Sequence, residues 1–183
     1  MKTYLITKIQ GTPDWSKIPA AEIDNCQWGY WADVAAKAQL CYDEEAIYAH
    51  FTAREANIRA EEQGQAAMPC LDSCMEFFFC PIAENKTYFN IEMNPNCAMY
   101  LGIGNDRYDL IRLLLPDVGN LDAQAARTED GWELTYKIPV SLIQRFFPTF
   151  KAESGAMMRG NFYKCGDYTV KEHYFAWNPV ECE

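Results

Sequence analysis

The chain has 183 residues, of which 49% are hydrophobic, and this is enough apolar material for a sizeable core without disulfides or metals. With 26 acidic and 16 basic residues, the net charge is −10, and no run of Lys and Arg occurs. Proteins that bind nucleic acids or anionic membrane surfaces need a cluster of basic residues, which this sequence lacks. No stretch of the sequence is apolar enough to cross a bilayer. We therefore expect neither a nucleic-acid nor a membrane partner.

In the first third of the chain, apolar and polar residues alternate in two runs. These lie on either side of the acidic turn Asp43-Glu44-Glu45 and predict two antiparallel strands. A polar segment rich in Ala, Glu and Gln follows and is either a short helix or a long loop. The expected elements are a strand at Tyr4–Ile9, an irregular lead-in at Thr12–Ile23, an aromatic stretch of open type at Trp28–Asp33, strands at Ala36–Tyr42 and Ala46–Arg54, and the polar segment Ala56–Ala67.

The rest of the chain repeats short alternating runs separated by turn residues. Ser141 is expected to cap a short helix, Leu142–Phe147, which Pro148 ends. The other expected elements are strands at Met75–Cys80, Thr87–Asn94 and Met99–Ile103, an apolar run at Leu110–Leu115, a connecting loop at Leu121–Glu129, and strands at Trp132–Ile138, Met157–Cys165 and Glu172–Trp177.

Some ten short strands at regular spacing are typical of a sandwich or jelly roll. No internal repeat and no low-complexity linker divides the chain. We therefore predict an all-β, antiparallel β-sandwich with one or two short helices, and a single domain over residues 1–183.

The cysteines and the first residues of the chain give an indication of the cellular compartment. Met1–Gly11 lacks the apolar segment of a secretory signal, and several of the 8 Cys lie inside apolar strand patterns, where a thiol behaves as a small hydrophobe. We expect reduced thiols and a cytoplasmic location as the sequence stands, or an extracellular location if a signal has been removed; the localisation stays open.

The central pair of strands has two different faces, because side chains alternate across a strand. One face of Asp72–Cys80 carries Glu76, and the matching face of Thr87–Asn94 carries Asn90, Glu92 and Asn94. The same pattern gives Arg159, Asn161 and Tyr163, then Tyr174 and Asn178, in the last strands. Carboxylates and amides match the donors and acceptors of sugar hydroxyls, and an aromatic ring such as Trp177 can cover the apolar face of a pyranose. The pattern therefore favours carbohydrate as the partner, although a solvated polar surface is the plainer explanation of any one such residue.

Five ordered motifs carry a resemblance to a known family. Between about Ile23 and Pro179, the sequence resembles family 9 carbohydrate-binding-module-like domains of the DOMON-like β-sandwich group. The motifs are Asp72-Ser-Cys-Met-Glu-Phe-Phe-Phe, Tyr88-Phe-Asn-Ile-Glu-Met-Asn, Gly131-Trp-Glu-Leu-Thr-Tyr-Lys-Ile-Pro, Arg159-Gly-Asn-Phe-Tyr-Lys-Cys-Gly and His173-Tyr-Phe-Ala-Trp-Asn-Pro.

The resemblance implies non-catalytic sugar binding by two Trp rings with a Glu, an Arg and Asn side chains. It assigns Glu76 as the Glu, Trp177 as one ring, and Arg159 and Asn161 as hydrogen-bonding partners. The sequence departs from the family just before Asp72, where Met68-Pro-Cys-Leu stands in place of the second Trp; Trp28 and Trp31 are the substitutes considered. Relatives also continue beyond Trp-Asn-Pro with a last strand, so either the sheet ends one strand short or another segment pairs there.

Other functions remain as alternatives. Glu76 and Glu92 would be the carboxylates of a glycoside hydrolase, and His50 or His173 with a Met would be the ligands of a haem. Cys70 and Cys74 are four residues apart, but no second Cys or His pair follows at the spacing of a zinc finger. We therefore expect no zinc site and no other cofactor. Calcium at Asp43-Glu44-Glu45 or Asp106–Asp109 is left open. A protein-interaction or structural module is the main rival, and an unpaired sheet edge would allow a homo-oligomer.

Overall fold

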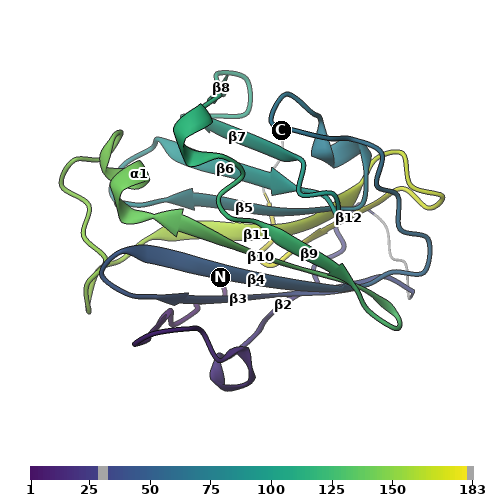
Figure 1. Cartoon of the computed structure of the whole chain (residues 1–183), viewed down its shortest axis with the longest axis horizontal. Coiled ribbons are helices and arrows are strands. Elements are labelled where there is room, and N and C mark those ends of the chain that lie inside the picture. Colours follow the sequence, from purple (N-terminus) through teal and green to yellow (C-terminus); the bar gives the residue numbers. More distant parts are fainter. Residues whose placement is uncertain (29–32, 181–183) are drawn as a thin grey trace.

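Two sheets of six strands each pack face to face in the computed structural model, which describes residues 1–28 and 33–180 (Figure 1). The first sheet contains β1 (Thr7–Lys8), β2 (Ala21–Ile23), β3 (Ala35–Tyr42), β4 (Ala46–Arg54), β9 (Gln124–Arg127) and β10 (Gly131–Pro139). The second contains β5 (Cys74–Cys80), β6 (Tyr88–Met93), β7 (Met99–Gly104), β8 (Ile111–Arg112), β11 (Arg159–Gly166) and β12 (His173–Ala176). One α-helix, α1 (Val140–Gln144), and three 3-10 turns, η1 (Trp15–Lys17), η2 (Pro69–Leu71) and η3 (Pro116–Val118), complete the elements.

The strand order confirms the predicted all-β sandwich. The first sheet runs β1-β3-β4-β10-β9, with β2 also paired to β3, and the second runs β12-β11-β5-β6-β7-β8. All pairs are antiparallel except β1 with β3. Consequently β5 and β6, which are consecutive in the chain, lie in the middle of the second sheet with neighbours on both sides.

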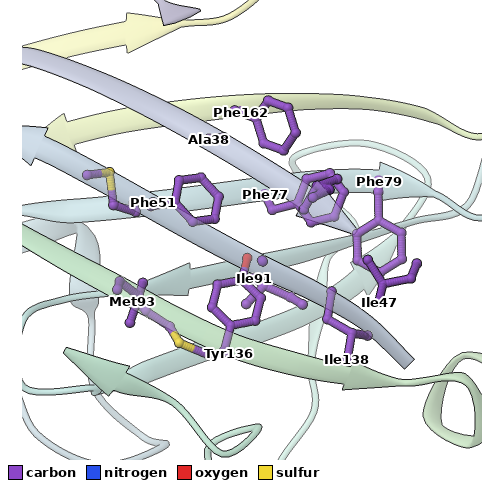
Figure 2. Packing of buried hydrophobic residues seen from close by; sticks show 14 of the residues in the cluster. Ala38, Ile47, Phe51, Phe77, Phe79, Ile91, Met93, Tyr136, Ile138 and Phe162 are labelled. Atoms are coloured by element: carbon purple, nitrogen blue, oxygen red, sulfur yellow. The ribbon is translucent and has the colours of Figure 1, made fainter. Parts of the chain in front are cut away.

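The core lies between the two sheets and is rich in aromatic rings (Figure 2). Phe77 of β5 stacks on Phe162 of β11 with ring centroids 5.0 Å apart, and Phe51 of β4 meets the same Phe162 edge-on at 5.8 Å. Burying each such ring stabilises the fold by about 1.5–3 kcal/mol. The inward faces of β5 and β6 are therefore fully used in packing, so the opposite faces of these strands point away from the core.

Most of the expected strands are present, but several predictions were wrong in detail. The expected loop Leu121–Glu129 contains β9, which extends the first sheet beyond β10. Ser141 does not cap the helix: α1 begins at Val140, directly after Pro139, which is still paired to Ala46 as the last residue of β10.

The N-terminal region also differs from expectation. Only Thr7 and Lys8 of the expected first strand pair, and the expected irregular lead-in contains η1 and β2. Ala56–Ala67 forms a loop, and most of the stretch Trp28–Asp33 lies outside the described residues.

The edge at β12 is paired in part by the N-terminal region. Asn25 forms an antiparallel bridge with Ala176, with N–H to O distances of 2.9 Å in both directions. Further along, the side chain of Gln27 donates to the Val180 carbonyl at 2.7 Å and accepts from the Val180 N–H at 2.6 Å. A segment from the start of the chain thus pairs at the sheet edge where the family's last strand was expected.

Within the described residues, no helix has both the length and the apolarity to span a membrane.

Candidate functional site

The antiparallel register places four polar or aromatic residues in one row across the outward face of the second sheet. Glu76 of β5 is directly opposite Glu92 of β6, with Tyr163 of β11 on one side and Tyr100 of β7 on the other. We call this outward surface, which bears Glu76, Asn90 and Glu92, the polar face. Sequence reasoning had placed these three residues on one face, and the register brings them together.

Asn90 lies one row away from the glutamates and is almost fully buried, with 3% of its surface exposed. Its Nδ2 donates to Glu92 Oε1 at 2.8 Å, while its Oδ1 is buried and has no hydrogen-bond partner among the described residues. Leaving a buried acceptor unsatisfied costs about 1–3 kcal/mol. The Asn90 amide oxygen is therefore an acceptor that a bound donor, such as a hydroxyl group, would satisfy.

The two glutamates are in an environment that favours their protonated forms. Burial, followed by the nearby Glu92 charge, raises the pKa of Glu76 to about 8. Burial also raises the pKa of Glu92, to about 7, although the Asn90 hydrogen bond and the Arg112 charge oppose the shift. A carboxyl group that keeps its proton near neutral pH both donates and accepts hydrogen bonds.

An aromatic ring and an arginine flank the carboxyl groups on the side of β7 and β8. The Arg112 guanidinium lies 4.5 Å from the centre of the Tyr100 ring, and it donates to the carbonyl oxygens of Ala66 (2.7 Å) and Ala67 (2.6 Å). Gly102 leaves the space for this arrangement, because a Cβ there would lie 2.6 Å from Tyr100 Cε1. Neither Tyr100 nor Arg112 was predicted from the sequence. Arg112 lies in the run Leu110–Leu115, which was noted only for its apolar residues.

A loop between β4 and β5 is held over one end of the polar face by Asp72. The fully buried Asp72 carboxylate accepts from the backbone N–H groups of Glu61 and Glu62, both at 2.8 Å, and from Asn94 Nδ2 at 2.7 Å, and Arg59 pairs with it as well. Asn94 and Asp72 thus have a structural role in this face. They fix the loop that supplies the Ala66 and Ala67 carbonyls to Arg112.

Arg159 and Asn161, which the sequence had assigned to the site, are occupied in holding the backbone. Arg159 is exposed, and its Nε donates to the carbonyl oxygen of Ala83 in the turn between β5 and β6 at 2.6 Å. Asn161 makes two hydrogen bonds with the backbone of Asn178. Its Nδ2 donates to the carbonyl oxygen (3.0 Å), and its Oδ1 accepts from the N–H group (2.9 Å).

Trp177 lies on the core side of the second sheet, away from Glu76. It is 9% exposed and packs against Phe162, with ring centroids 5.4 Å apart. Trp28, in contrast, is 46% exposed and meets Tyr174 edge-on at 6.4 Å, beside the outward face of β12. Met68, where the second ring was expected, is also exposed, and Trp31 lies outside the described residues.

The histidines of the haem alternative lie on different sheets. The His50 ring of β4 packs at a tilt against Trp15, with ring centroids 5.0 Å apart, and contacts Gln39 and Glu133. His173 of β12 is buried beside Lys164. A separate groove is lined by residues 57–61 with Tyr168 and Val170, none of which belongs to the polar face, and its lining includes the side chains of Asn57, Arg59 and Glu61.

Comparisons with known proteins give matches over nearly the whole chain. The model of carbohydrate-binding family 9 matches residues 9–183. A crystal structure of a Bacteroides uniformis ATCC 8492 protein, provisionally described as carbohydrate-binding, matches with a TM-score of 0.80 and 24% identity over 97% of this chain and 90% of that one.

Two structures of a family 9 module from Caldicellulosiruptor kristjanssonii also match, each at 13% identity. The complex with cellotriose has a TM-score of 0.64 and covers 96% of this chain and 84% of that one. The complex with glucose has a TM-score of 0.63, with coverage of 94% and 83%. Curated proteins give no significant match.

Proposed function

The chain belongs to carbohydrate-binding family 9, and from this membership we propose that its polar face binds a mono- or oligosaccharide. Carbohydrate-binding modules of this family are non-catalytic, so the proposed activity is binding without bond cleavage. The ligand would lie over β5 and β6, against Glu76, Asn90 and Glu92, with Tyr100 and Arg112 at one side.

The observation that carries the proposal is the unsatisfied oxygen of Asn90. Only two buried side-chain atoms among the described residues lack a hydrogen-bond partner, and the other one is the hydroxyl of Tyr136, in the core. A protein retains a buried acceptor without a partner at a cost, and a ligand hydroxyl would remove that cost on binding. The neighbouring Glu92 then offers a further hydrogen-bonding group in the next row of side chains.

A pyranose fits the rest of this surface. Each of its hydroxyls donates and accepts, and the protonated and ionised forms of Glu76 and Glu92 supply both complements. The rings of Tyr100 and Phe78 are half-buried and lie on the same face as the carboxyl groups. Such rings contact the apolar C–H face of a sugar. In this proposal Glu76 keeps the binding role that its motif implied, whereas Arg112 takes the place first given to Arg159.

Isothermal titration calorimetry with glucose, cellotriose and galactose tests the proposal. We expect saturable binding of at least one sugar, and a loss of about tenfold or more in affinity for Asn90→Ala and for Glu92→Gln, since each removes a hydrogen bond to the ligand. Glu22→Gln is the matched control, because Glu22 is an exposed β2 residue on the other sheet, paired only with Lys37 at 3.0 Å. No heat with any sugar, or wild-type affinity in Asn90→Ala, would overturn the proposal.

The non-catalytic part of the proposal has its own test. The protein is incubated with the sugars that bind, and products are separated by chromatography. We expect the oligosaccharide to be recovered intact. Cleavage that disappears in Glu76→Gln would make the domain a hydrolase instead.

A further inference from the structure

Two thiols, from the row of side chains next to that of Glu76 on the same face, lie together with the Glu76 carboxyl group. Cys74 of β5 is directly opposite Cys165 of β11, and Glu76 follows two residues after Cys74 on the same face. The two Sγ atoms and one carboxylate oxygen all lie within 4.8 Å of one another. We call these three residues the Cys74–Glu76–Cys165 cluster.

The cluster is well shielded from solvent and is formed by rigid elements. The exposed fractions are 0% for Cys74, 3% for Cys165 and 7% for Glu76. The Cys165 thiol donates to Glu76 Oε1 at 2.8 Å and lies 3.9 Å from the carbonyl oxygen of Cys70 in η2. Because all three side chains come from paired central strands, their relative positions are fixed by the backbone ladder.

The surroundings of the cluster carry negative charge. Glu92 is directly opposite Glu76, and Asp167 and the cation Lys164 are the other charged groups that act on it. A divalent cation bound by the cluster would neutralise the charges of its ligands and of these acidic neighbours.

We propose that Cys74, Cys165 and Glu76 bind one thiophilic divalent ion of the Zn²⁺ type. Two thiolates and one carboxylate oxygen are ligands that Zn²⁺ takes in tetrahedral sites, and separations below 4.8 Å suit ligands around one such ion. The fourth ligand would be a water molecule or Cys70, whose carbonyl oxygen lies 3.9 Å from Cys165 Sγ. On binding, each thiol and any protonated Glu76 releases its proton to the solvent.

The proposed site is separate from sugar binding except at Glu76. A bound ion would hold the Glu76 carboxylate on the side of β11 and leave Asn90 and Glu92 of β6 for a sugar. The two cysteines are far apart in the chain, so the spacing of cysteines along the sequence gives no sign of the site.

Titration of the reduced protein with Cd²⁺, in the absence of sugar, tests the metal site. Cd²⁺ reports binding through its ultraviolet thiolate-to-metal charge-transfer band. We expect a saturable band at one Cd²⁺ per chain, which Zn²⁺ displaces. The band should vanish in Cys165→Ser and Cys74→Ser, and the affinity should fall by about tenfold or more in Glu76→Gln. Cys80→Ser is the matched control, since Cys80 is a buried cysteine on the same face of the same strand whose thiol contacts only the turn carbonyls of Ile82 and Asn85, and Arg159.

X-ray absorption of the Zn²⁺-loaded wild-type protein gives a reading that needs no variant to fold. We expect sulfur ligands at ~2.3 Å together with oxygen at ~2.0–2.2 Å. A missing charge-transfer band, an unchanged band in Cys165→Ser, unchanged affinity in Glu76→Gln, or a shell of oxygen alone would each overturn the proposal. Calorimetry with sugars is a separate experiment, so failure of either proposal is visible without the other.

Discussion

Glu76 and Glu92 are directly opposite each other on β5 and β6, and both lie in surroundings that raise their pKa values. Like charges directly opposite each other on neighbouring strands are destabilising, and burial adds to the cost. The pair is therefore a place where the fold is less stable than it would be with apolar residues. Such a local cost at a row of side chains is typical of surfaces kept for binding.

The first prediction concerns pH. The folded-state pKa values of Glu76 and Glu92, about 8 and about 7, lie above the ordinary value of 4.5. The folded protein thus holds protons that the unfolded chain releases, so this contribution to stability is complete below about 4.5 and is lost as pH rises towards 8. We expect the free energy of unfolding to fall over this range, and to fall less in Glu76→Gln. Urea unfolding of both proteins at several pH values measures this; parallel pH profiles would contradict it.

The second prediction concerns a buried ion pair in the core. Lys164 is 0% exposed, and its Nζ lies 3.1 Å from Glu55 Oε2, which also accepts from Trp132 Nε1 at 3.2 Å. Removing one partner leaves an uncompensated buried charge, so we expect Lys164→Met to destabilise the fold by about 3–5 kcal/mol. The double variant Lys164→Met with Glu55→Gln should recover part of that loss. Chemical denaturation decides, and a loss below about 1 kcal/mol in the single variant would be inconsistent with this account.

The third prediction concerns the loop between β4 and β5. Asp72 accepts two backbone N–H groups and the Asn94 amide, so Asp72→Ala removes the anchor of residues 59–68. We expect faster hydrogen exchange in that segment and weaker sugar binding, because Arg112 depends on its carbonyls. Asp106→Ala is the control, since Asp106 bonds only its own exposed turn. Unchanged exchange in residues 59–68 would show that other contacts fix the loop.

The fourth prediction concerns Gly102. A methyl group there would displace the Tyr100 ring, which lies 2.6 Å from the added Cβ, and would disturb the contact with Arg112. We expect Gly102→Ala to weaken sugar binding about as much as Tyr100→Ala, with a stability change of less than about 1 kcal/mol, because the Tyr100 side chain is able to move outwards. Calorimetry and thermal unfolding of the two variants check this, and full affinity in Gly102→Ala would remove Tyr100 from the site.

The scaffold was predictable because strand faces follow a period of two. That rule alone placed Glu76, Asn90 and Glu92 on one face, and the short turn after Cys80 indicated that the two strands pair. The strand β9 was missed because Gln124–Arg127 is short, largely exposed and lacks an apolar face.

The site was less predictable where it depends on contacts between distant segments. Trp177 looked like an exposed ring at a strand end, yet the alternation along β12 turns it into the core, against Phe162. The sequence does not distinguish Arg112 from other arginines, because its side chain is held by carbonyl groups of a loop about 45 residues earlier in the chain. Cys165 reaches Cys74 only through the pairing of β11 with β5.

Nuclear magnetic resonance locates the surface that a sugar contacts, which we expect to be the polar face. A ¹⁵N-labelled sample is titrated with a sugar that calorimetry shows to bind, and the side-chain amide of Asn90 is followed together with the backbone of β5 and β6. We expect the Asn90 side-chain resonances and those around Glu76 and Glu92 to shift most. Shifts confined to the groove at residues 57–61 and Tyr168, with Asn90 unchanged, would contradict it.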